Sequence, residues 1–180
     1  MDNTQDNKTT QDISTPEQIA KSLFNYAIDR EDIKWLLSHL PKDYKIQAHT
    51  LEYELNMLKI ISVGWCIPFC MLDHPLKNTI AELYWGHIQS FSETISSTTE
   101  ATIGKKINYF TVLKERLDTY IQAMTKVTED TDPLNIIGPE FAGFCGDKDD
   151  PFSILTGSKL FATTLLQIKK FLEGIKAFPK

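Results

Sequence analysis

Residues 51–72 read LEYELNMLKIISVGWCIPFCML, and this stretch decides the fold of the chain. Apolar side chains recur along it at helical spacing, and one such stripe comprises Leu51, Leu55, Leu58, Trp65, Phe69 and Leu72. The first half of the stretch also carries charged residues, whereas the second half is apolar on every side. Because helices that are apolar all round are buried all round, we predict a central helix from about residue 44 to 72, with its second half almost wholly buried.

A proline lies inside this predicted helix. Pro68 would clash with the carbonyl four residues earlier, which belongs to Gly64. Glycine is small and flexible, so the pair predicts a kink in the central helix rather than its end.

Capping signals predict further helices on both sides of this segment. Thr15 and Gln18 form a capping box around Pro16, typical of a helix start. The charged residues 29–32 predict a break before a second helix, with Asp29 as its cap; one continuous helix is the alternative. Pro41 is expected to close the second helix.

Three later prolines, Pro75, Pro139 and Pro151, are read as first residues of helices. Residues 90–102 are rich in serine and threonine, which predicts fraying or a turn, and Gly104 is expected to stop that helix. Another helix is expected from about Asn108, although residues 107–113 are also compatible with a strand.

The predicted fold class is therefore all-α: a single-domain bundle of five to seven helices, residues 15–180, around a buried, kinked central helix. Residues 1–14 are polar and aperiodic, and we expect a disordered N-terminal tail.

Composition excludes several classes of protein. Of the 180 residues, 42% are apolar, too many for a disordered chain, and three cysteines are too few for a disulfide scaffold. A net charge of −5 with only two arginines argues against nucleic acid as a partner. The longest uncharged run, residues 60–72, is too short to span a membrane. The first residues show no secretory signal, so we expect a soluble, cytoplasmic protein.

One candidate metal site follows from spacing. Cys66, Cys70 and His74 would share a helix face if the helix continued, and thiolates with an imidazole suit zinc or copper(I). Cys145 or His87 would supply a fourth ligand. The favoured alternative is that the thiols are reduced, buried and unmetallated, because they lie in an apolar segment.

A candidate ligand pocket lies beside the predicted kink. Its expected lining is Trp65, Cys66, Phe69 and His87, since a kinked buried helix leaves space and apolar pockets with few polar groups bind small molecules.

Motifs for nucleotide binding, serine nucleophiles and di-iron centres are absent from the sequence. We therefore predict a non-enzymatic interaction or regulatory module without a cofactor, acting on a protein partner or as a homodimer. A bundle that binds a small molecule or a metal is the alternative.

Overall fold

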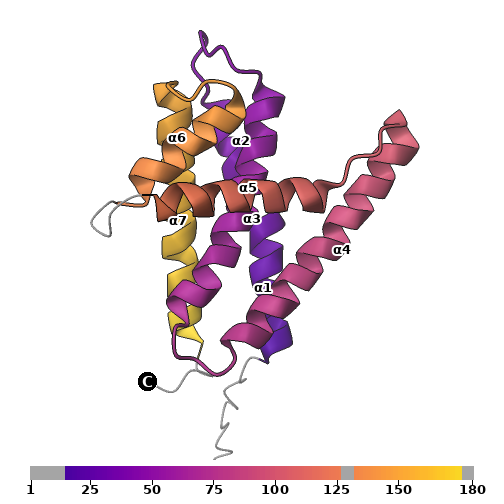
Figure 1. Ribbon diagram of the computed structural model, residues 1–180, viewed down its shortest axis with the longest axis vertical. Coiled ribbons are helices and arrows are strands. Elements are labelled where there is room, and N and C mark those ends of the chain that lie inside the picture. Colours follow the sequence, from indigo (N-terminus) through magenta and orange to yellow (C-terminus); the bar gives the residue numbers. More distant parts are fainter. Residues whose placement is uncertain (1–14, 127–131, 176–180) are drawn as a thin grey trace, which may run out of the picture.

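The computed structural model describes residues 15–126 and 132–175, which form seven helices and, within those ranges, no strand (Figure 1). The helices are α1 (Pro16–Ile28), α2 (Glu31–Ser38), α3 (Ala48–Cys70), α4 (Lys77–Ile103), α5 (Tyr109–Thr125), α6 (Leu134–Cys145) and α7 (Pro151–Gly174). The prediction of an all-α bundle of five to seven helices is confirmed. The predicted tail at residues 1–14 lies outside the described residues.

Helix α3 is the centre of the bundle. It packs against all six other helices, most extensively against α7. In Figure 1, α1 and α7 flank α3, α5 crosses over it, and α4 inclines away from it towards the turn that leads to α5. Its inward-facing side chains, including Leu55, Leu58 and Val63, are fully buried, so α3 supplies the core that the sequence pattern predicted.

The ends of α3 differ from the prediction. The helix begins at Ala48 rather than near residue 44, and it ends at Cys70 rather than residue 72. Val63 and Cys66 are buried as expected, but Phe69 is 63% exposed and Leu72 is 68% exposed. The expectation of an almost wholly buried second half is therefore wrong for the last turn, because the chain turns away there to begin α4.

Gly64 lies at a close approach between α3 and α4. A Cβ atom at this position would lie 2.3 Å from a ring carbon of Trp85, so only glycine lets the indole pack against the α3 backbone. Pro68 is an internal residue of α3, and the helix continues two residues beyond it. A kink at this proline stays a prediction.

Two of the four predicted proline starts are confirmed. Pro16 and Pro151 each follow a capping residue as the first residue of a helix. Pro75 instead lies in the turn before α4, which begins at Lys77. Pro139 is internal to α6, whose apolar residues extend the helix back to Leu134. A proline alone does not determine where a helix begins, and neither α4 nor α6 has a side-chain cap at its start.

The break between α1 and α2 is confirmed, with Arg30 rather than Asp29 at the cap position. The Asp29 carboxylate still accepts a hydrogen bond from the Glu31 N–H at 2.8 Å. This joint places four charged residues, 29–32, side by side at one edge of the bundle.

The serine- and threonine-rich segment does not fray. Helix α4 continues to Ile103, and Gly104 ends it with a positive φ of 69°. Hydroxyl groups along the segment donate to the carbonyls four residues earlier, as from Ser90, Thr94, Ser96, Ser97, Thr98 and Thr102. The side chains thus bond to the helix backbone instead of competing with it.

Asn108 caps α5, which begins at Tyr109. The alternative of a strand over residues 107–113 is therefore wrong, because residues 109–113 are helical.

Among the helices that the structure describes, none is both long and apolar enough to cross a membrane.

Candidate functional site

The four residues of the predicted ligand pocket do not line one common cavity among the larger cavities of the described residues. Cys66 is buried, Trp65 is half-buried, and His87 is half-buried with its ring 5.5 Å from that of Phe24. Phe69 lines a cavity of about 330 Å³ near the end of α7, but the other three line none of the larger cavities in residues 15–126 and 132–175.

The predicted metal ligands are also not aligned as the spacing suggested. Because α3 ends at Cys70, His74 lies in the following turn, where its Nδ1 accepts a hydrogen bond from the Leu76 N–H at 3.1 Å. Within the described part of the chain, no group of three or more His, Cys, Asp or Glu residues is arranged to hold a metal ion.

The three cysteines are free thiols. The Cys66 Sγ donates to the carbonyl of Leu165 on α7 at 3.9 Å. Burial raises the pKa of Cys66 and of Cys70, and it raises the pKa of Cys145 to about 12. Protonated thiols are poor nucleophiles and poor metal ligands, so this chemistry favours a packing role for all three.

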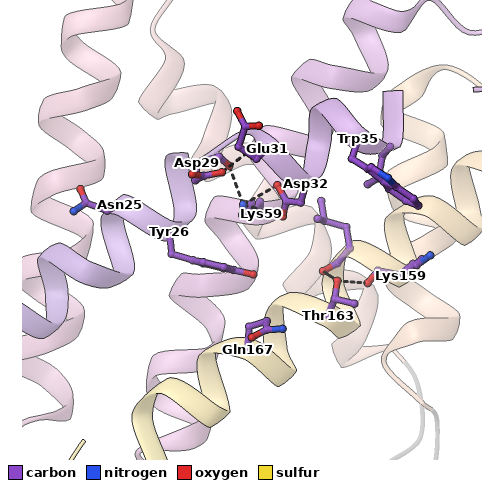
Figure 2. A pocket seen from close by; sticks show the side chains of 12 residues that line it. Asn25, Tyr26, Asp29, Glu31, Asp32, Trp35, Lys59, Lys159, Thr163 and Gln167 are labelled. Carbon is purple, nitrogen blue, oxygen red and sulfur yellow. Dashed lines mark hydrogen bonds and ion pairs between the residues drawn. The ribbon is translucent and has the colours of Figure 1, made fainter. Parts of the chain in front are cut away.

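A groove on another face of the bundle is the candidate functional site, and Figure 2 shows it from close by. The joint of α1 and α2 forms one wall, α7 forms the other, and Lys59 of α3 lies between them. Its volume is about 720 Å³, within the range of ligand sites. The lining residues are Asn25, Tyr26, Asp29, Glu31, Asp32, Trp35, Leu36, Lys59, Lys159, Leu160, Thr163 and Gln167.

Lys59 fixes the floor of the groove. Its side chain is buried, and its Nζ donates to the Asp29 carbonyl at 2.8 Å and to the Asp32 carboxylate at 2.9 Å (Figure 2). The same ammonium lies 4.6 Å from the centroid of the Tyr26 ring, a cation–π distance. Asp29 is the C-terminal cap of α1, where the helix dipole favours a cation. Lys59 therefore holds the α1–α2 joint onto α3.

The walls of the groove are aromatic and partly apolar. Trp35 is 55% exposed, and the Lys159 Nζ lies 5.7 Å from the centroid of a Trp35 ring. Tyr26 is half-buried, and burial raises the pKa of its phenol, which therefore stays neutral. Exposed tryptophan at the edge of a groove is the residue type most enriched at binding hot spots.

The groove continues along α1 and α7 beyond the main cavity. A smaller cavity of about 160 Å³ shares Tyr26 and Gln167 with it and ends at Phe171. Lys159 and Phe171 lie twelve residues apart on α7, which corresponds to about 18 Å of helix. The complete groove is thus as long as about three helical turns.

Charge is distributed unevenly along the groove. Asp29, Glu31 and Asp32 cluster at the α1–α2 joint, whereas Lys159 stands alone on the α7 wall. Lys59 pairs with Asp32 and Lys34 pairs with Glu31, so among the described residues Asp29 is the acidic residue of the joint that takes part in no ion pair.

Sequence reasoning missed this site. Lys59 is one of the charged residues in the first half of the stretch 51–72, yet its neighbours Leu58, Ile60 and Ile61 are all apolar. A lysine inside such a run was a signal for a buried, paired ammonium. The walls could not be foreseen, because they join segments that are more than 120 residues apart.

No family model matches this chain, and comparisons with curated proteins and with solved structures find no match.

Proposed function

We propose that this protein is a non-enzymatic interaction module that binds an amphipathic helix of a partner protein in the groove between the α1–α2 joint and α7. One observation carries the proposal: a groove about three helical turns long presents an exposed tryptophan, Trp35, on one wall. Amphipathic helices bind in such grooves through apolar residues spaced at i, i+3, i+4 and i+7.

The charges of the groove define the occupant further. Asp29 stands at the end formed by the α1–α2 joint, while Phe171 and the aliphatic part of Gln167 lie at the other end. The expected partner helix has an apolar face and a lysine or arginine at the end that lies against the joint. Complementary charge of this kind sets the orientation of the bound segment.

The chemistry of the groove supports binding rather than catalysis. The Lys59 amine is committed to two hydrogen bonds and a cation–π contact, and the phenol of Tyr26 is neutral. A cytoplasmic location is part of this proposal, supported by three free cysteines, which are ordinary in a reducing compartment.

The test is selection from a displayed library of randomised amphipathic helices, followed by affinity measurement with purified protein. Enriched helices should share apolar residues at helical spacing and a basic residue at one end. Their affinity should fall at least tenfold with Trp35→Ala. The matched control is Ile103→Ala, an equally exposed apolar residue at the far end of α4, which should leave affinity unchanged.

Two results would overturn the proposal. One is a selection without enrichment, or with helices that bind the Trp35→Ala variant as tightly as the parent. The other is a dimer of this chain in sedimentation velocity that Trp35→Ala dissociates, which would make a second copy the occupant of the groove.

A further inference from the structure

A second cavity, separate from the groove, is lined mainly by residues of α3, α4 and α5. Figure 1 shows α4 inclined away from α3 and α5 crossing over α3. Its volume is about 340 Å³. Most of its lining is apolar or aromatic, from Ile28, Tyr53, Met57, Ile60, Phe91, Ile95, Tyr109 and Leu113. A cavity of this size and character suits the apolar body of a small molecule.

Charged side chains gather on one side of this cavity. Arg30 and His49 line it together with Glu52, and one Arg30 nitrogen, Nη2, is hydrogen-bonded to the Glu52 carboxylate. The side-chain amide of Asn56 donates to the backbone carbonyl of Glu52 at 2.7 Å. A guanidinium has five N–H donors, and the Arg30 side chain is about half-exposed. Donors therefore remain for a second carboxylate.

Two hydroxyl groups in the lining are also uncommitted. Neither the Tyr53 phenol nor the Ser92 hydroxyl has a side-chain hydrogen-bond partner among residues 15–126 and 132–175. Burial raises the pKa of Tyr53 to about 12, so its phenol remains a donor at neutral pH. Both hydroxyls are therefore free to donate a hydrogen bond to a ligand that enters the cavity.

We propose that this cavity binds a small monocarboxylate with an aliphatic or aromatic body. The carboxylate lies at Arg30, within reach of the donors on that side of the cavity, and the body lies between Met57, Phe91 and Leu113. Arg30 supplies a permanent cation with several N–H groups, and the Tyr53 and Ser92 hydroxyls can donate as well, which favours an acid over an amine. The site is distinct from the groove, so this proposal stands or falls independently of the proposed interaction.

The test uses three probes of equal chain length: octanoate, octan-1-ol and octylamine. Binding is measured by isothermal titration calorimetry and by chemical-shift changes in the full chain. Octanoate should bind, octan-1-ol should bind at least tenfold more weakly, and octylamine should not bind. Tighter binding of the amine or the alcohol would overturn the assignment of a carboxylate, and no binding of octanoate would overturn the proposal itself.

Paired variants at the rim separate ligand binding from a structural role. Arg30→Gln should weaken octanoate binding at least tenfold, because it removes the cation. Glu52→Gln should leave binding equal or tighten it, because it removes the carboxylate that competes for Arg30. Both changes break the same ion pair, so an equal loss of binding in the two variants would overturn the proposal.

A filling variant tests the location. Ile95→Trp should abolish octanoate binding by occupying the cavity, whereas Ile103→Trp, on the same helix but outside the cavity, should not. Retained binding with Ile95→Trp would overturn this location. If that variant does not fold, the opposed effects of the two rim variants decide the matter alone.

Discussion

Replacing Asp32 by alanine should destabilise the fold, whereas replacing Lys59 by methionine should leave stability almost unchanged. The two residues form one ion pair at 2.9 Å, but they differ in exposure: the Lys59 side chain is 2% exposed and that of Asp32 is 41% exposed. Removing Asp32 leaves the buried Lys59 ammonium without its counterion. Removing the ammonium instead leaves the Asp32 carboxylate, which water can hydrate. The asymmetry follows from the desolvation penalty of a buried charge.

The magnitudes can be worked from these contacts. Breaking a fully buried pair costs about 3–5 kcal/mol. Lys59 keeps the Asp29 carbonyl as a partner after Asp32→Ala, and partial solvent screening lowers the loss further, so we expect about 2 kcal/mol. Lys59→Met retains most of the apolar stem and removes the desolvation penalty, so its effect should stay within about 1 kcal/mol.

Urea denaturation of the two single variants and the double variant measures these effects. With a slope of about 2 kcal/mol/M, Asp32→Ala should lower the midpoint by about 1 M. In the Lys59→Met background the same change should have almost no effect, giving a coupling free energy of about 2 kcal/mol. The control is Glu31→Ala, whose partner Lys34 is exposed, with an expected effect under about 0.5 kcal/mol. A Lys59→Met variant less stable than Asp32→Ala, or a coupling below about 0.5 kcal/mol, would refute this reasoning.

Three further predictions concern packing and ionisation. Gly64→Ala should destabilise the fold by about 1–3 kcal/mol, because the new methyl group would clash with the Trp85 indole. Gly86→Ala has open space around it and should stabilise the fold by up to about 1 kcal/mol. Thermal unfolding of both variants would show whether the two changes in stability have opposite signs. Cys66 and Cys145 should resist a thiol reagent at pH 8 until urea unfolds the chain, and rapid labelling of the native protein would contradict their burial. Burial raises the pKa of Cys145 and of Tyr53 to about 12, so both groups stabilise the fold fully below their unfolded pKa values of about 8.5 and 10; the free energy of unfolding should fall as the pH rises from 9 to 12, and a flat profile would contradict this.

Periodicity and capping in the sequence were sufficient to predict the helices themselves. Thr15 caps α1 as predicted, and Asp150 caps α7 just before the predicted start at Pro151; each cap is a local hydrogen bond between residues three apart. The course of α4 was not predictable from composition, since serine and threonine disfavour helices only when their hydroxyls bond outside the helix backbone. Here those hydroxyls donate within the helix.

Polar pairing across the bundle was beyond what the sequence pattern could predict. Glu54 is buried on α3, where both its oxygens accept from Arg116 of α5 at 2.9 and 3.1 Å. The guanidinium also lies 4.1 Å from the Phe144 ring. Arg30 likewise pairs with Glu52 of α3. Both arginines of the chain therefore form ion pairs with carboxylates of α3. Such pairs depend on which helices become neighbours, and that information resides in three-dimensional packing.

The helical alignment predicted for Cys66, Cys70 and His74 was wrong for a related reason. The metal-site prediction assumed that one helix continues through His74, but the helix ends at Cys70 and the chain turns. The thiols then pack towards α7, as the contact of Cys66 with Leu165 shows. Spacing within one segment could not reveal that a helix from the other end of the chain would cover it.

The dependence of α3 on α7 has a consequence for the chain during synthesis. Eighty residues separate the end of α3 from the start of α7, which a ribosome adds in about 4–16 s. Through that interval the side of α3 that contains Cys66 lacks its cover and offers an apolar surface to chaperones. The groove also has only one wall until α7 docks. Under the proposed function, a partner helix that needs both walls would engage no nascent chain, so its binding would report that folding is complete.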